Sequence, residues 1–296
     1  MNELHENHTA AWLTQAVIDS ASTAPDARLR TIFSSLIEHL HAFVREVELT
    51  PEEWMAGIEF LTATGQKCDG VRQEFILLSD TIGVSMLVDA LASRVASGGT
   101  ESTVLGPFFT TDAHDVAAGG SIAKAGAGQP LFVSGRVRDT SGQPVANAVI
   151  EVWEVDGTGT YDVQYADRVE PDCRGRLHTD ANGAFDFRGI RPVSYSIPGD
   201  GPVGAMLAAL GRHTMRPAHV HFKIESRGHV PLTTAIYAKG DQYLNGDAVF
   251  GVKPSLIGDF VRHDDPAEMR ERGCDTPFFT LERDFVLVPV QVAAPA

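Results

Sequence analysis

The sequence changes its periodicity near residue 97, and this change limits the folds open to the chain. Before it, apolar residues recur at intervals of three and four, as in amphipathic helices. After it, glycine, proline, valine and threonine become frequent, and short apolar runs alternate with turn residues. Because the two patterns are segregated, we predict an α+β fold, with a helical domain over residues 1–100 and an all-β sandwich over residues 101–296.

The helical part shows clear start and stop signals. Thr50 and Glu53 are spaced as a capping box, and Gly65 is expected to end the helix that they begin. The predicted helices cover residues 1–22, 29–47, 51–65 and 71–94. A helical layer of this size must bury its apolar face against the rest of the chain or against a second copy of itself.

The β-rich part contains seven runs of strand-like residues. Asn182-Gly183 separates two of these runs and predicts a hairpin. The predicted strands cover residues 131–138, 148–155, 177–179, 184–187, 219–225, 232–237 and 285–289.

The charge balance restricts the possible partners. The formal net charge is −15, so nucleic acid and anionic membrane surfaces are poor partners. The three cysteines, Cys68, Cys173 and Cys274, are far apart and indicate a reducing compartment. The sequence shows no apolar run of membrane-spanning length and no signal-peptide pattern, so we expect a cytoplasmic protein.

A His-x-His pair lies in the strand predicted over residues 219–225. Alternate side chains of a strand share one face, so His219 and His221 project into the same space. Such a pair can bind a metal, or both residues can be ordinary hydrogen-bonded histidines. Arg216, three residues upstream, and Tyr195, after a Gly/Pro-rich segment, favour a functional site.

Two tyrosines bear on the choice of metal. Tyr161 lies in a glycine-rich turn after a strand, and Tyr195 lies between Pro192 and Pro198. Each alone would more often be structural. Two phenolates with two imidazoles would favour Fe(III), because only a strongly Lewis-acidic ion keeps phenols ionised at neutral pH. Zinc remains the commoner partner of a His-x-His pair.

The longer motifs resemble those of the intradiol ring-cleaving dioxygenases, and within them the enzymes that act on hydroxyquinol. The resemblance covers nearly the whole chain and rests on long motifs in the same order. These are LLSD (77–80), TVLGPFF (103–109), SGRVRDTSGQPVANAVIEVWEVDGTGTYDVQYAD (134–167), RGR (174–176), residues 179–187, PVSYSIPGDGPVG (192–204), RPAHVHFKI (216–224), GDQYL (240–244) and DAVFGVKPSLIGDF (247–260).

The resemblance implies a ligand set and a substrate pocket. Fe(III) would be held by Tyr195 and His221 as the axial pair and by Tyr161 and His219 as the equatorial pair. Tyr195 would also act in catalysis, and Arg216 would lie beside the substrate and stabilise developing charge. The implied pocket residues are Leu77, Asp80, Val104, Leu105, Gly106, Pro107, Phe108, Ile197 and Pro198.

The resemblance also implies a reaction and partners. The substrates would be O2 and a small aromatic diol or triol, most closely hydroxyquinol cleaved to maleylacetate in the catabolism of aromatic compounds. The N-terminal helices would form a homodimer, with a phospholipid held between them. The chain has Ala235 where catechol-cleaving relatives tend to carry Gln, and Ser194 and Ser196 flank Tyr195 where many relatives have Pro.

Three alternatives stay open at this point. A catechol or chlorocatechol 1,2-dioxygenase would share the site, but Asp80 favours hydroxyquinol because a carboxylate could accept a hydrogen bond from the third hydroxyl. A non-catalytic β-sandwich binding module would hold no iron. A zinc hydrolase would use only His219 and His221 as ligands, and no further acidic ligand follows them at a familiar spacing.

Overall fold

Three N-terminal helices come first in the structure, a computed structural model that describes residues 10–70, 72–93, 98–124 and 126–290. They are α1 (Ala10–Ser20), α2 (Ala27–Glu46) and α3 (Pro51–Gln66). The capping box is confirmed, because the Glu53 amide donates to Thr50 Oγ1 (3.2 Å) and the Thr50 amide donates to the Glu53 carboxylate (3.0 Å). Helix α3 continues one residue past Gly65, where we expected it to end.

The single helix predicted over residues 71–94 is wrong, because the structure divides it into two. Helix α4 (Glu74–Thr81) and helix α5 (Val84–Ser93) are bent by 75° at the break between them. Gly83 has a φ of +78°, a conformation that ends a helix and that glycine adopts without steric cost. Residues 71 and 94 lie outside the described residues.

The described strands form two five-stranded sheets and one short ribbon. The first sheet has the order β10-β11-β1-β12, with β4 also paired to β1, and the second has the order β3-β2-β7-β8-β9. The first sheet consists of β1 (Pro130–Asp139), β4 (Ala184–Ile190), β10 (Val261–His263), β11 (Phe278–Glu282) and β12 (Phe285–Leu287). The second consists of β2 (Val149–Trp153), β3 (Arg174–His178), β7 (His219–Glu225), β8 (Leu232–Ala238) and β9 (Ile257–Gly258).

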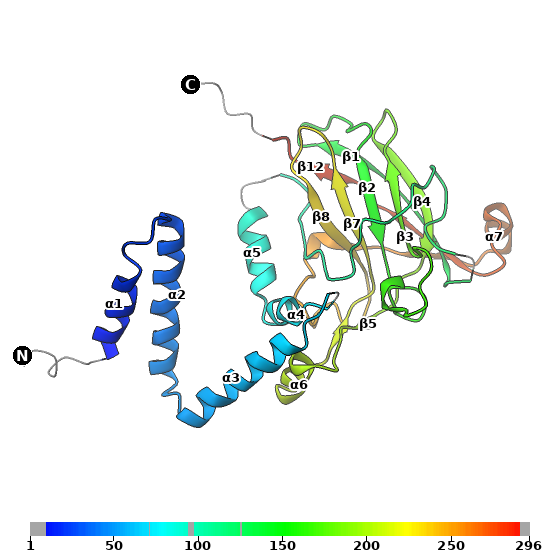
Figure 1. Ribbon diagram of the computed structural model, residues 1–296. Helices are drawn as coiled ribbons and strands as arrows, with labels where there is room; N and C mark the ends of the chain where they lie inside the picture. The colour runs from blue at the N-terminus through cyan, green and yellow to red at the C-terminus, as the bar shows by residue number, and fades with distance from the viewer. Residues whose placement is uncertain (1–9, 71, 94–97, 125, 291–296) are drawn as a thin grey trace, which may run out of the picture. The chain divides into compact units, whose positions relative to one another are not determined.

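The two sheets pack face to face over a shared apolar core, as Figure 1 shows for the strands right of α5. The Phe187 ring of β4 lies 6.3 Å from the Phe222 ring of β7, and Phe222 lies 4.8 Å from Phe285 of β12. Alternate residues of β1, β4, β7 and β12 contribute to this layer, as the periodicity of two predicts. The α+β class and the sandwich are therefore confirmed.

The turn at Asn182-Gly183 is confirmed, but the hairpin is not. Gly183 has a φ of +74°, and its amide donates to the Asp180 carbonyl (3.1 Å). The flanking strands then pair in different sheets, β3 with β2 and β4 with β1. The turn therefore carries the chain from one layer of the sandwich to the other.

Several short elements had no sequence prediction. The ribbon joins β5 (Tyr195–Ser196) to β6 (Met215–Arg216), and it places Tyr195 directly opposite Arg216. The others are the strands β9, β10 and β11, the helices α6 (Pro202–Ala209) and α7 (Pro266–Arg272), and the 3₁₀ turns η1 (Asp162–Gln164) and η2 (Pro254–Leu256). Such elements are too short to show a hydrophobic period.

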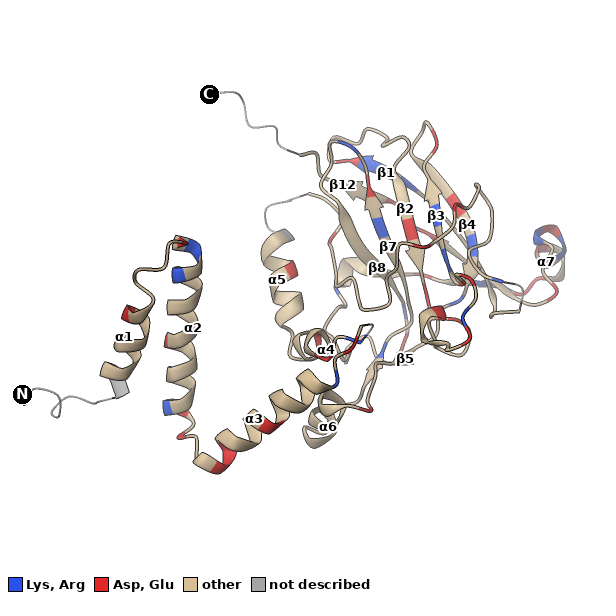
Figure 2. Cartoon of the chain, in the orientation of Figure 1, with Lys and Arg blue, Asp and Glu red and all other residues tan. Residues whose placement is uncertain are grey.

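The chain divides into two compact units, residues 1–63 and 64–296. Helices α4 and α5 belong to the second unit, and the division into functional domains at residue 100 stays a prediction. Figure 2 shows acidic and basic residues interspersed over the strands and loops of the second unit. None of the described helices is by itself both long and apolar enough to cross a membrane, and α4 and α5 meet that requirement only when taken together.

Candidate metal centre

Strand β7 brings the two predicted histidines together. The Nε2 atoms of His219 and His221 are 3.0 Å apart, and both rings are buried. His219 Nδ1 lies 2.7 Å from the Pro217 carbonyl, which only accepts, so Nδ1 carries the proton and Nε2 presents a lone pair. Burial and the charge of Arg216 lower the pKa of His219 to about 3, and burial lowers the pKa of His221 well below its ordinary value. Both imidazoles are therefore neutral, as metal binding requires.

The two predicted tyrosines also meet. Tyr161, just before η1, donates to the hydroxyl of Tyr195 on β5 at 3.2 Å, and both rings are buried. Burial, and after it repulsion from Tyr195, raises the pKa of Tyr161 well above 10. This phenol is consequently protonated at neutral pH unless a cation stabilises the phenolate.

Arg216 joins the two pairs into one cluster. Its Nη1 lies 3.3 Å from the Tyr195 hydroxyl and 3.3 Å from His219 Nε2. The guanidinium is buried and forms an ion pair with Asp247, at 3.1 Å from Nε to Oδ1. The two phenols and two imidazoles that we expected from the sequence thus surround one buried point beside a fixed positive charge.

Asp247 and Tyr237 also bind the Arg216 guanidinium. The sequence did not predict a role for either residue. Arg216 Nη2 donates to the Tyr237 hydroxyl (3.1 Å) and to Asp247 Oδ2 (3.3 Å). Burial alone would lower the pKa of Arg216, but attraction from Asp247 and the tyrosine oxygens raises it well above its ordinary value. Asp247 opens one of the motifs, yet no spacing rule connects it to an arginine 31 residues away.

The two phenols and two imidazoles of the cluster form a donor set that suits a trivalent metal ion. Across the described residues, no group of three or more His, Cys, Asp and Glu side chains is arranged to hold a metal ion. Here two phenol oxygens join two imidazole nitrogens, and His221 Nδ1 is buried without a hydrogen-bond partner among the described atoms. A cation such as Fe(III) would both ionise the phenols and separate the two facing Nε2 atoms.

An ion pair outside the cluster fixes the loop that carries Tyr161. Asp162, the next residue, forms a buried ion pair with Arg174 of β3. The same guanidinium donates to the Phe108 carbonyl at 3.1 Å. The Phe108 ring stacks on Tyr161 with centroids 4.5 Å apart. Arg174 therefore ties the segments on both sides of the Tyr161 ring.

The predicted pocket residues lie in three settings. Leu77, Val104 and Ile197 pack in one buried apolar cluster, which Ala248 also joins. Gly106 has a φ of +74°, and a Cβ there would lie 3.9 Å from the His221 ring, so this loop passes beside the cluster. Leu105 and Pro107 are exposed and Pro198 is half-buried, and their contact with a substrate stays a prediction.

Asp80 is buried and lies within electrostatic reach of Arg216 and Asp247. Burial raises the pKa of its carboxyl, while a hydrogen bond with Ser85 and attraction from Arg216 oppose that rise. The negative charge of a second carboxyl, Asp247, also raises the pKa of Asp80. Asp80 of α4 is therefore a buried acceptor within the electrostatic reach of Arg216.

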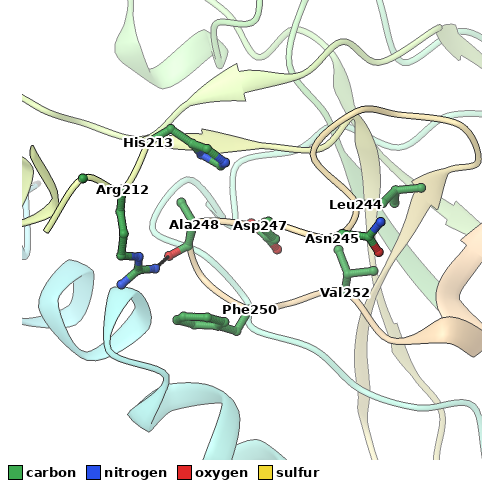
Figure 3. Close-up of a pocket in the computed structure, with 10 residues that line it drawn as sticks. Arg212, His213, Leu244, Asn245, Asp247, Ala248, Phe250 and Val252 are labelled. Atoms are coloured by element: carbon green, nitrogen blue, oxygen red, sulfur yellow. Dashed lines mark hydrogen bonds between the residues drawn. The ribbon is translucent and has the colours of Figure 1, made fainter.

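A pocket of about 450 Å³ adjoins the loop that carries Asp247. Figure 3 shows Arg212, His213 and Phe250 around it, and Asp247 is one of its lining residues. Arg212 is held by the carbonyls of Thr81 (2.7 Å) and Ala248 (3.1 Å). The predicted ligands do not line this pocket, so it is a neighbour of the cluster and not its entrance.

Glu154 follows Trp153, whose ring stacks on His221. Its environment predicts how the free energy of unfolding depends on pH. One of its oxygens accepts from the Ile190 amide (2.9 Å), and burial raises the pKa from 4.5 to about 8. Between these values the folded state binds the proton that the unfolded chain releases, so the free energy of unfolding falls as pH rises from about 4.5 to about 8. The slope is at most about 1.4 kcal/mol per pH unit.

Urea denaturation at pH 5.5, 7.0 and 8.5 checks this expectation. Glu154→Gln should flatten the profile, because the amide keeps an oxygen acceptor and does not titrate. Equal slopes in the two proteins would assign the pH dependence to other groups.

Comparison with known proteins shows which family the chain resembles. The family model "Dioxygenase" matches residues 104–287, and "Catechol dioxygenase N terminus" matches residues 26–100. The 6-chlorohydroxyquinol 1,2-dioxygenase of Cupriavidus pinatubonensis is 48% identical to the chain, with 94% of this chain and 96% of the relative covered. The hydroxyquinol 1,2-dioxygenase of Rhodococcus opacus is also 48% identical, with coverages of 95% and 94%.

A solved structure gives the same result. The hydroxyquinol 1,2-dioxygenase from Pseudomonas putida DLL-E4 superposes with a TM-score of 0.86 at 46% identity, covering 95% of this chain and 98% of that one. The matches span both the helical part and the sandwich, including the cluster described above. The chain therefore belongs to the family of intradiol ring-cleavage dioxygenases and is an enzyme of that kind.

Proposed function

We propose that the enzyme cleaves hydroxyquinol (1,2,4-trihydroxybenzene) between its adjacent hydroxyl-bearing carbons and forms maleylacetate with O2. The observation that carries this proposal is the meeting of two buried phenols and two buried neutral imidazoles beside Arg216. The reaction adds both oxygen atoms of one O2 to one hydroxyquinol. The relatives named above support the choice of substrate.

Fe(III) is the cofactor that we propose, held by Tyr161, Tyr195, His219 and His221. When bound, it would supply a Lewis acid that accepts both deprotonated oxygens of an ortho-diol and activates the ring toward O2. Tyr195 would receive a proton from a substrate hydroxyl, because its phenol oxygen lies at the edge of the cluster that Arg216 contacts. Arg216, fixed by Asp247 and Tyr237, would stabilise negative charge that develops beside Tyr195.

The test of this function combines a spectrum with product analysis. Purified enzyme is expected to show a broad visible band from phenolate bound to Fe(III), and the band should shift when hydroxyquinol is added without O2. Admission of ¹⁸O2 should then yield maleylacetate carrying two labelled atoms. A colourless protein that stays colourless after iron is supplied would overturn the ligand set.

Asp80 is proposed to select hydroxyquinol over catechol. The buried carboxylate can accept a hydrogen bond from the hydroxyl that catechol lacks. We expect Asp80→Ala to lower kcat/KM for hydroxyquinol at least about tenfold more than for catechol, because one such bond is worth about 1.5–3 kcal/mol. Asp80→Asn keeps an acceptor and serves as the control. Equal losses on both substrates would remove this role from Asp80.

We further propose that the enzyme is a homodimer joined through its N-terminal region, residues 1–100, with residues 101–296 as the catalytic domain. No residue of α2 is buried, and a face of exposed apolar residues of this kind marks an interaction site. The exposed apolar residues of that helix are Leu29, Ile32, Leu36, Leu40, Phe43 and Val44. Sedimentation should give twice 31.8 kDa, and mass spectrometry of an organic extract would detect a bound phospholipid. The proposed location is the cytoplasm.

A further inference from the structure

Asp241 accepts three hydrogen bonds in the loop that follows β8. Its Oδ2 accepts from the Ser194 hydroxyl at 2.5 Å and from the Ala218 amide at 3.0 Å. Its Oδ1 accepts from the Tyr243 amide at 2.9 Å. The two donors to Oδ2 come from segments that are 24 residues apart in the sequence, so one oxygen atom joins them.

The two joined residues each precede a proposed metal ligand. Ser194 lies immediately before Tyr195 of β5, and Ala218 immediately before His219 of β7. Strand β7 is held by neighbours on both sides, β2 and β8. Strand β5 has two paired residues in a two-stranded ribbon, which is a much weaker support.

Asp241 is anchored to the second sheet, which contains β7 and β8, independently of Ser194. Its amide donates to the Ala238 carbonyl (3.2 Å), and the Ala238 amide donates to the Ala218 carbonyl (2.8 Å). The carboxylate therefore belongs to the rigid β7–β8 side. The Ser194 hydroxyl is the group that connects the weak ribbon to it.

We propose that Ser194 and Asp241 are positioning residues that fix the Tyr195 backbone at a set distance from His219. This inference rests on the proposed Fe(III) site and names the residues that hold its geometry. The tether acts on the backbone, so the phenol can still turn about its side-chain bonds when a substrate hydroxyl gives up its proton. Serine lacks the fixed φ of proline, so position 194 depends on this hydrogen bond for stiffness.

The flanking serines offer a matched pair of variants. Ser196 lies on the other side of Tyr195, but its hydroxyl bonds to Thr214 Oγ1 (2.6 Å) and not to Asp241. Ser194→Ala removes the tether, Ser194→Thr keeps a hydroxyl, and Ser196→Ala removes a hydroxyl at the same distance along the chain. Asp241→Asn weakens both bonds to Oδ2, and if it does not fold, Ser194→Ala decides.

The first readout uses the iron-loaded enzyme. A hydrogen bond to a charged group is worth at least about tenfold in an equilibrium. We expect Ser194→Ala to lose iron to excess EDTA about ten times faster than wild type and to shift the visible phenolate band. Ser194→Thr and Ser196→Ala should stay within about twofold of wild type.

The second readout uses metal-free protein, so the tether is decided even if the iron site is wrong. The Ile197 amide donates to the Thr214 carbonyl (2.9 Å) and reports opening of the ribbon. We expect its hydrogen exchange to be about ten times faster in Ser194→Ala and unchanged within twofold in Ser194→Thr. Equal exchange in Ser194→Ala and wild type would overturn the tether, whereas a wild-type protein that never gains a phenolate band would overturn the proposed function alone.

Discussion

His221→Ala is expected to lose the visible band and to lower kcat/KM by about a thousandfold or more. The Nε2 of His221 faces that of His219 at 3.0 Å, and its ring stacks on Trp153 at 4.7 Å, so no other side chain can take its place without rebuilding the cluster. Lewis-acid stabilisation is worth several kcal/mol, which corresponds to at least three powers of ten in rate. Iron content, the absorption spectrum and steady-state kinetics measure the three consequences together.

A histidine outside the cluster provides the control. His229 lies outside the cluster and is half-buried, and its ring Nδ1 lies 3.3 Å from the Arg227 carbonyl, so His229→Ala should retain iron, colour and rate. Chelator treatment of wild type should produce the same loss as His221→Ala, and Fe(III) but not Zn(II) should restore activity. A His221→Ala protein that keeps its iron and its band would show that the metal lies elsewhere.

Asp247→Ala is expected to cost about 3–5 kcal/mol of unfolding free energy and about a hundredfold in kcat. The side chains of Arg216 and Asp247 are 3% and 2% exposed, so removal of the carboxylate leaves an unpaired charge in the interior. Arg216 would also lose the group that aims its Nη1 at Tyr195. Losing one preorganised donor beside developing charge lowers rates by two to three powers of ten in other enzymes.

An exposed ion pair provides the control for the buried Arg216–Asp247 pair. Asp259 pairs with Lys239 at 3.2 Å, but both side chains are 67% exposed. Asp259→Ala should therefore change the free energy of unfolding by less than about 1 kcal/mol and leave kcat unaltered. If the two variants lose equal stability in urea titrations, the Arg216–Asp247 pair contributes no more than a solvated pair.

The sequence predicts best where one physical rule acts locally. Residues 219–225 alternate between apolar side chains, which join the sandwich core, and side chains of the opposite face, and the structure gives β7 the same bounds. The capping box at Thr50 follows from a spacing of three. The break at Gly83 was not predicted, because a glycine within an apolar stripe is as compatible with a continuous helix as with a bend.

Long-range polar pairs limited the prediction of the site. Local patterns placed His219 with His221 and drew attention to Tyr161 and Tyr195, and the resemblance combined the four residues into one ligand set. The partners Asp247, Asp241 and Arg174 depend on how loops from different strands meet, and no sequence period encodes that meeting. Membership of the dioxygenase family also excludes the alternative of a non-catalytic binding module and leaves the zinc hydrolase without support.

The Arg174 bridge between Asp162 and Phe108 joins segments that are far apart in the sequence, and this has a consequence for when the proposed iron site can form. Groups in and beside the cluster are contributed by positions from 106 to 251, and the pairs Tyr161–Tyr195 and Arg216–Asp247 join residues 34 and 31 positions apart. Contacts of this kind form late in folding, after the strands on both sides have paired. In refolding experiments with iron present, the phenolate band should therefore appear only with the last kinetic phase. A chain still being synthesised would lack the Arg216–Asp247 ion pair, and with it the complete cluster, until residue 247 has emerged.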